Sequence, residues 1–232
     1  MLTAKKKIVK KDAGQQKDLP WYDWDNIQNT FEEHGKIIWG VLIGVVVLAG
    51  GWYFYQQGQE DENIEANRQL AAVSQVYQSG QYKMAIAGDP SRGLPGLEEI
   101  AYNYESTPAG QHAMLYLGNC YLYTQDYDKA IETFENASPG DPLLNAAKYA
   151  GLGAAYFNKE NFEMAAETFE KAAKAYENDM VTAQRYLQAA KAYLKLGNVD
   201  KGKEMLLKVK EAKTTKYDRD LTRLSAQYDL DI

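Results

Sequence analysis

The sequence predicts an all-α protein in which a single N-terminal transmembrane helix precedes an α-solenoid of paired helices. A run of 19 residues without charge, from 37 to 55, has the length and composition of a membrane span. Further along the chain, small and large residues recur at fixed offsets, with spacings of 35 and then 37 residues. Self-similarity at such a period is typical of stacked helical repeats.

The apolar run, IIWGVLIGVVVLAGGWYFY, extends from Ile37 to Tyr55. As a helix it would rise about 28 Å, close to the hydrocarbon thickness of a bilayer. Trp39 lies near one end and Trp52 near the other, where aromatic rings favour the membrane interface. The alternatives are a buried core helix and a cleaved signal peptide. Soluble cores rarely contain so long an uncharged run, and 36 residues precede it, so we predict a membrane anchor.

Charge asymmetry predicts the orientation of this anchor. Residues 1–36 contain seven lysines, whereas the first positive residue after the run is Arg68. Positively charged flanks stay in the cytoplasm, so residues 1–36 are predicted to be a cytoplasmic tail and residues 56–232 to be exported. In a Gram-negative bacterium this is a single-pass protein of the inner membrane with a periplasmic C-terminal domain, in contact with membrane lipid.

The predicted tail contains the stretch DLPWYDWDNIQNTF. Helical spacing places Trp21, Trp24, Ile27 and Phe31 near one face, with acidic residues elsewhere. This pattern predicts either an interfacial helix leading into the span or a docking helix for a membrane partner.

The repeat is clearest in the stretch AMLYLGNCYLYTQDYDKAIETFENASPGDP. Small residues at Gly118 and Ala130 let two helices approach closely, while Tyr121 and Phe134 fill the space between units, and Pro142 is predicted to end the pair. Matching residues follow at Leu152, Gly153, Tyr156, Ala165, Phe169 and Ala172, and more loosely at Ala189, Ala190, Tyr193, Gly202, Leu206 and Val209. These offsets resemble those of the tetratricopeptide repeat, whose period is about 34 residues.

The repeats imply a division of the exported part. Residues 56–110 are predicted to form a linker helix and a degenerate first repeat, in which helices at 63–79 and 97–104 are interrupted by the loop AGDPSRGLPG. Residues 111–215 are predicted to form three tetratricopeptide repeats, and residues 216–232 a capping helix.

Composition and motifs argue against several functions. The net charge of -6 disfavours nucleic-acid binding, and one cysteine, Cys120, allows no internal disulfide or thiolate metal cluster. His34 and His112 lie in different segments, which disfavours a two-histidine metal site. The chain has no phosphate loop, GxSxG or HExxH motif. We therefore predict no enzyme activity, no cofactor, no metal and no small-molecule substrate.

In tetratricopeptide arrays the first helix of each pair lines a concave face. Taking positions about one turn before and after each small residue predicts a partner-binding groove. It comprises His112, Leu115, Asn119, Leu122, Tyr123, Ala154, Phe157, Leu187, Lys191 and Leu194, with Ala147, Ala150 and Gln184 also facing inward. A mostly apolar face with one lysine predicts a hydrophobic or helical partner rather than an acidic peptide. The alternative is that these residues pack against the end helices of the array.

The whole layout resembles the YfgM-like ancillary subunits of the SecYEG translocon, in the form found in Bacteroidota. The junction GLEEIAYNYESTPAGQHAMLYLG contributes to the resemblance through Tyr104, Thr107, Ala109 and Gly110, and the similarity extends over most of residues 37–230. It implies association with SecYEG and a PpiD-like periplasmic chaperone, and a role in passing translocated polypeptides to chaperones. The alternative is a structural scaffold or assembly factor of another envelope membrane complex.

Overall fold

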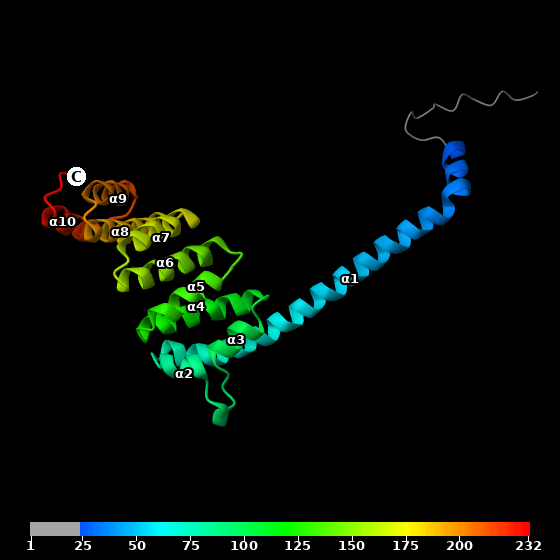
Figure 1. Ribbon diagram of the computed structural model, residues 1–232, viewed down its shortest axis with the longest axis horizontal. Helices are drawn as coiled ribbons and strands as arrows, with labels where there is room; N and C mark the ends of the chain where they lie inside the picture. Colours follow the sequence, from blue (N-terminus) through cyan, green and yellow to red (C-terminus); the bar gives the residue numbers. More distant parts are fainter. Residues whose placement is uncertain (1–23) are drawn as a thin grey trace, which may run out of the picture. The chain divides into compact units, whose positions relative to one another are not determined.

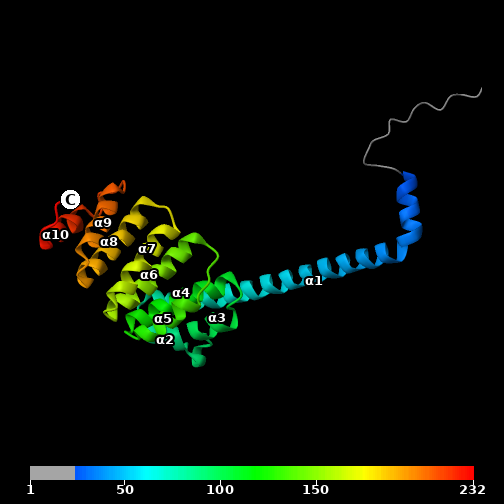
Figure 2. The same cartoon turned by 45° about the horizontal axis from the view of Figure 1, so that its top comes forward.

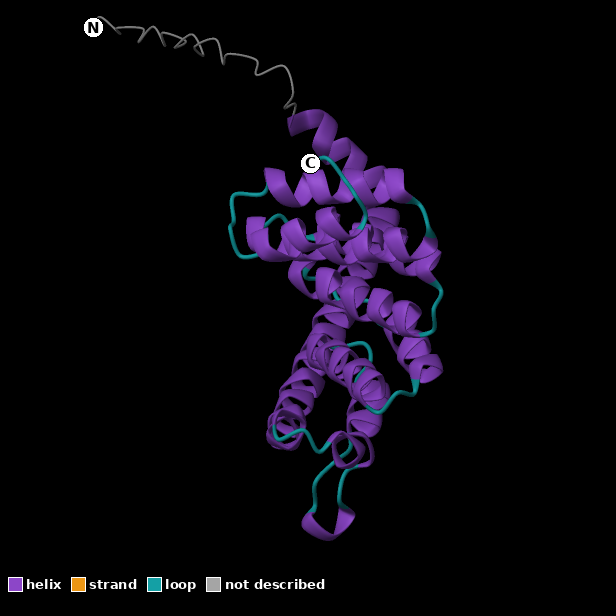
Figure 3. Cartoon of the chain, turned by 90° about the vertical axis from the view of Figure 1, so that its left-hand side faces the viewer, coloured by secondary structure: helices purple, strands orange, loops and turns teal. Residues whose placement is uncertain are grey.

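The computed structural model describes residues 24–232, except for the side chains of residues 24–34 and Ile38. Within this range every regular element is a helix and no strand occurs (Figure 3), so the predicted all-α class is confirmed. Trp21 and the side chains of Trp24, Ile27 and Phe31, on which the interfacial-helix prediction depends, lie outside the described part. The chain divides into two compact units, residues 1–55 and 56–232.

The first unit contains the apolar portion of helix α1 (Trp24–Gln78). The side chains along this portion are exposed, including Trp39, Val46 and Phe54 at 63%, 69% and 76%. Among the described residues, α1 is the one helix long and apolar enough to cross a membrane. A helix satisfies its own backbone hydrogen bonds, so such a segment is stable in lipid. The geometry is consistent with a single-pass membrane protein.

The second unit is built from consecutive helices that pack side by side (Figures 1 and 2). After the last part of α1 come α2 (Tyr82–Ala87), the 3-10 helix η1 (Pro90–Arg92), α3 (Leu97–Asn103), α4 (Pro108–Tyr123), α5 (Tyr127–Asn136), α6 (Pro142–Asn158), α7 (Phe162–Ala175), α8 (Asp179–Leu196), α9 (Val199–Glu211) and α10 (Asp218–Gln227). Pairs α4/α5, α6/α7 and α8/α9 form three successive hairpins, and α10 follows them.

Side-chain caps fix the start of each hairpin helix. An oxygen of the capping residue accepts a hydrogen bond from a backbone N–H in the first turn, which that turn would otherwise leave unpaired. The caps of α4–α9 are Thr107, Asp126, Asp141, Asn161, Asn178 and Asn198. Pro142 directly follows one of them as the first residue of α6. The prediction that Pro142 ends a pair was therefore wrong, because the fixed φ of proline also suits the first position of a helix.

A left-handed residue marks the turn inside every hairpin. Gln125, Glu160 and Gly197 have φ of 65°, 60° and 86°, and each immediately precedes the cap of a second helix. Gly80, with φ of 76°, occupies the same place between α1 and α2. The end of α1 is therefore the first helix of a further repeat, whose second helix begins at α2.

This second helix is split into α2 and α3. Thirteen positions lead from Ala85 to Glu98, whereas five lead from the matching Ala130 to Glu135, so the first repeat carries eight extra residues. The insertion projects from α2 and α3 and carries η1 (Figure 1). Its neck is closed by an antiparallel bridge between Asp89 and Leu94. A glycine flanks the insertion on each side, and a Cβ at Gly88 would lie 2.5 Å from a backbone oxygen.

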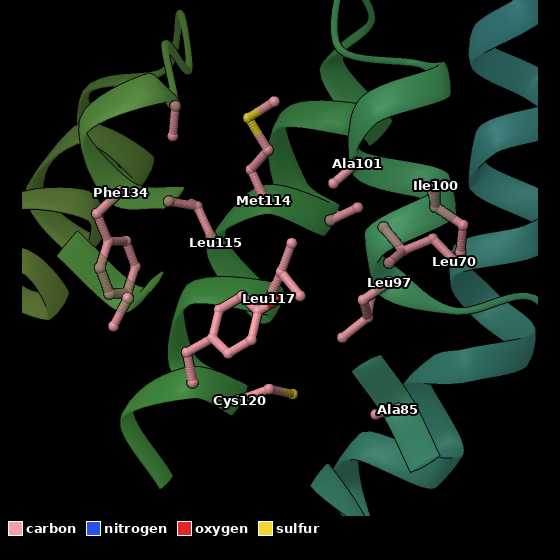
Figure 4. Packing of buried hydrophobic residues seen from close by; sticks show 14 of the residues in the cluster. Leu70, Ala85, Leu97, Ile100, Ala101, Met114, Leu115, Leu117, Cys120 and Phe134 are labelled. Atoms are coloured by element: carbon pink, nitrogen blue, oxygen red, sulfur yellow. The ribbon is translucent and has the colours of Figure 1, made fainter. Parts of the chain in front are cut away.

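Glycines of the first helices pack against phenylalanine rings of the second helices. A Cβ on Gly118 would lie 2.7 Å from the ring of Phe134, and one on Gly153 would lie 2.8 Å from that of Phe169. The predicted close helix contact at Gly118 is thus confirmed. Figure 4 shows Phe134 at one side of a buried cluster that extends through Leu117 and Leu97 to Leu70 of α1. The first repeat therefore shares a continuous core with the next.

Three tyrosines join neighbouring repeats by equivalent hydrogen bonds. In each case a tyrosine hydroxyl on a first helix donates to a glutamate on the second helix of the preceding repeat. The pairs are Tyr121 with Glu98, Tyr156 with Glu135 at 2.7 Å, and Tyr193 with Glu170 at 2.6 Å. Burial, followed by this hydrogen bond, raises the pKa of Tyr156 to about 12 and also raises that of Tyr121 and Tyr193. The repeated bond thus links each of these first helices to the preceding repeat.

Candidate partner-binding groove

The first helices of the three hairpins enclose a groove of about 440 Å³ on the repeat domain. Helix α4 contributes Asn119, Leu122 and Tyr123 to its lining; α6 contributes Ala147, Ala150, Gly151, Ala154 and Asn158; and α8 contributes Arg185 and Gln188. Because consecutive repeats place α4, α6 and α8 next to one another, the groove crosses three repeats.

The lining combines a small-residue floor with neutral polar groups. Alanines and one glycine of α6 form the middle, so the backbone of a bound segment can approach closely. Asn119, Asn158 and Gln188 each carry a carboxamide, which offers both donors and acceptors and therefore matches a peptide group. No carboxylate occurs among the lining residues. These features suit a polypeptide ligand.

An aromatic stack supports one wall of the groove. Tyr123 is 61% exposed, yet its ring stacks on that of Tyr82 with centroids 4.4 Å apart and planes 12° apart. Tyr82 in turn meets Tyr77 edge-on at 5.8 Å, and Tyr77 stacks on Tyr116 at 4.8 Å. The exposed ring is therefore held in place before any partner binds, which reduces the entropy lost on binding.

Arg185 is the single charged residue of the lining. Its Nη1 donates to Oε1 of Gln188 at 2.8 Å, and its Nε is buried with no hydrogen-bond partner in the described part of the chain. The hydroxyl of Tyr217 is likewise buried and unpartnered there. Burial lowers the pKa of the guanidinium, and the Tyr217 hydroxyl acts in the opposite direction.

Four of the ten predicted groove residues line the groove: Asn119, Leu122, Tyr123 and Ala154. Leu115, Leu187 and Leu194 were assigned to it wrongly, since they are 6%, 3% and 3% exposed and belong to the hydrophobic cores. Figure 4 shows Leu115 within the buried cluster.

Helical spacing alone does not separate the two faces. Leu115 lies three residues before Gly118, and Leu187 and Leu194 lie three before and four after Ala190, and all three are buried in the cores. Leu122, four residues after Gly118, lines the groove instead. A spacing of one turn therefore selected residues of both faces.

The remaining three predicted residues lie outside the groove lining. His112 is exposed and lines a separate depression of about 350 Å³ with Ser106, Pro108 and Leu144 among its neighbours. The ring of Phe157 contacts that of Phe162, with centroids 5.2 Å apart. The ammonium of Lys191 lies 3.9 Å from a carboxylate oxygen of Asp220 on α10.

Sequence reasoning missed Gly151, Asn158, Arg185 and Gln188. Gln188 lies one residue beyond Leu187, which was chosen instead, and two residues before the small position Ala190. A rotation of about 100° per residue separates this groove position from the buried leucine. Gly151 carries no such signal, because a Cβ there would point at the ring of Phe134.

Metal and thiol chemistry find no support in the described part of the chain. Among the described side chains, no group of three or more His, Cys, Asp or Glu is placed to hold a metal ion. The thiol of Cys120 is buried in the first core cluster, and burial raises its pKa to about 12. A thiol is nucleophilic only as the thiolate, so Cys120 is a packing residue.

Family models match both halves of the chain. A tetratricopeptide repeat-like domain matches residues 28–142, and a tetratricopeptide repeat matches residues 149–179 and 183–215. The chain carries tetratricopeptide-like repeats. These repeats are typically non-catalytic modules of protein–protein interaction, which agrees with the groove geometry. No curated protein matches the chain.

Proposed function

We propose that this protein is a non-catalytic membrane-anchored scaffold that binds protein partners through the groove of its repeat domain. The observation that carries the proposal is the groove itself, a carboxylate-free channel with a small-residue floor and a fixed aromatic wall. The exposed apolar portion of α1 supports the anchor, since exposed apolar side chains in such number need lipid around them.

The proposal extends to the cellular setting. We place the anchor in the bacterial inner membrane, with a cytoplasmic N-terminus and a periplasmic repeat domain, because the lysines are concentrated before the span. The resemblance to YfgM-like proteins favours an accessory role at the Sec translocon, with SecYEG and a PpiD-like chaperone as partners and translocated polypeptides as the clients handed over. The alternative is a scaffold or assembly factor of another envelope complex.

Affinity purification of the full chain in mild detergent tests the partner. Recovery of translocon subunits supports the translocon role, whereas recovery of a different set of envelope proteins supports the alternative. Recovery of lipid and detergent alone contradicts the scaffold proposal.

A paired variant tests whether the groove is the binding surface. Tyr123→Asp with Ala147→Asp places two charges in the groove at exposed positions, so the cores remain intact. Recovery of the partner should fall sharply. Tyr102→Asp is the matched control, because Tyr102 is an exposed tyrosine, 49% accessible, that lies outside the groove lining. If both variants retain the partner equally, recognition lies elsewhere in the chain.

A further inference from the structure

Arg185 of α8 has a structural counterpart in Lys148 of α6, whose ammonium group forms hydrogen bonds within the fold. Lys148 lies seven residues after the cap Asp141, and Arg185 lies seven residues after the cap Asn178, so the two occupy equivalent positions in α6 and α8. The ammonium of Lys148 donates to the backbone carbonyls of Glu135 and Ala137, which lie at the end of α5. A cation there satisfies the unpaired carbonyls of a helix C-terminus.

Arg185 makes no such contact. Within the described residues its guanidinium has one hydrogen bond, to the neutral amide of Gln188, and no ion pair. A partly buried cation without a carboxylate is costly, and its cost is removed by an anion that enters the same site. Burial lowers the pKa of Arg185 and no carboxylate opposes this effect.

The surroundings of Arg185 decide which anion fits. The other lining residues are three carboxamides, one tyrosine, one leucine and small residues, which suit a polypeptide chain. A planar guanidinium matches a carboxylate better than any other anionic group found on an ordinary polypeptide.

We propose that the groove binds a polypeptide segment that places the carboxylate of one Asp or Glu side chain against Arg185. The inference rests on the proposed function, since it names the partner chemistry of the same groove. It changes the sequence-based expectation of a hydrophobic or helical partner, rather than an acidic peptide, to a segment with one acidic residue. Asp and Glu side chains, rather than a chain terminus, are chosen because the groove crosses three repeats and any polypeptide has many side-chain carboxylates but one terminal carboxylate.

Peptide selection on the full chain in detergent micelles tests this inference. The probe is a library of random peptides joined at their C-termini to a phage coat protein, so none has a free terminal carboxylate. Groove-dependent peptides are those that bind the wild type but not Tyr123→Asp with Ala147→Asp. Amidated synthetic copies are then measured with their acidic residue as Glu or as Gln.

Groove-dependent peptides should share an acidic residue at one position, and its replacement by Gln should weaken binding about tenfold, as expected for the loss of one charge-assisted hydrogen bond. Arg185→Gln should remove this difference. Lys191→Gln is the matched control on the same helix and should retain it, because Lys191 already faces Asp220.

Two outcomes overturn the inference alone: groove-dependent peptides without a shared acidic residue, or a Glu preference that survives in Arg185→Gln. If no selected peptide depends on the groove, the proposed function of the groove fails as well, so the two failures are distinguishable.

Discussion

The ring of Phe134 lies between two glycines, and one added methyl group should destabilise the repeat domain. A Cβ at Gly118 would be 2.7 Å from Cε1 and Cζ of the ring. This distance is much shorter than an ordinary van der Waals contact, which begins at 3.4 Å. Phe134 is only 1% exposed. A Cβ at Gly151 of α6 would lie 2.3 Å from Cζ of the same ring, so the backbone of α6 also leaves the ring little room to move away.

These distances set the expected magnitude for Gly118→Ala. Overpacking a filled core costs about 1–3 kcal/mol, while replacing a helical glycine by alanine stabilises by about 1 kcal/mol. A net loss of up to about 2 kcal/mol relative to the wild type is therefore expected. For a domain the size of residues 56–232, this lowers the melting temperature by up to roughly 8 °C.

Thermal unfolding followed by circular dichroism at 222 nm, on the full chain in detergent, measures the effect. Tryptophan fluorescence is unsuitable, because all four tryptophans precede residue 56. Gly58→Ala is the matched control: it gains the same helix propensity, and nothing lies within 4 Å of its added methyl. Phe134→Leu should reduce the effect of Gly118→Ala, because the smaller side chain leaves room. If Gly118→Ala melts no lower than Gly58→Ala, the ring is not confined as described.

Three further predictions concern other parts of the chain. Tyr193→Phe should destabilise by about 1–2 kcal/mol in urea denaturation, since Glu170 loses its donor in a partly buried site; an unchanged midpoint contradicts a role for this bond. Burial raises the pKa of Cys120 to about 12, above the value of about 8.5 expected for an unfolded thiol, so this group's contribution to stability is present below pH 8.5 and is lost as pH rises towards 12. Iodoacetamide should accordingly label Cys120 at pH 9 only after unfolding, and rapid labelling of the folded chain would show the site to be open. Protease added to spheroplasts should digest the repeat domain and spare the lysine-rich tail, whereas digestion of the tail would invert the proposed orientation.

The fold class could be predicted because its signals are local in the sequence. A charge-free run predicts a membrane span by its length, and Gly118 and Gly153 were predicted to be small so that two helices can approach closely; an aromatic ring of the second helix lies against each. The left-handed turn residues Gln125 and Glu160 could not be recognised in the same way. Only glycine is typical of that conformation, so the equivalence of the turns became visible through the backbone itself.

The groove was only partly predictable, because its position depends on the angle between helix faces. Choosing residues one turn from Gly118 and Ala190 selected positions on both faces, since Leu115 and Leu187 are buried whereas Leu122 lines the groove. Arg185 illustrates a second difficulty. Its sequence context does not distinguish it from Lys148, and only the hydrogen bonds show that Lys148 serves the fold while Arg185 is left with Gln188.

The insertion between α2 and α3 leaves and rejoins the first repeat at nearly the same point. Gly88 and Gly96 allow this closure, and the helix beyond it resumes in phase, so that Glu98 meets Tyr121 as Glu135 meets Tyr156. The packing of the array therefore does not depend on the length of the insertion. Its tip near Ser91 is a natural host position for an epitope or a fluorescent reporter, and such a graft would let partner exchange be followed in living cells while the solenoid and its groove stay as they are.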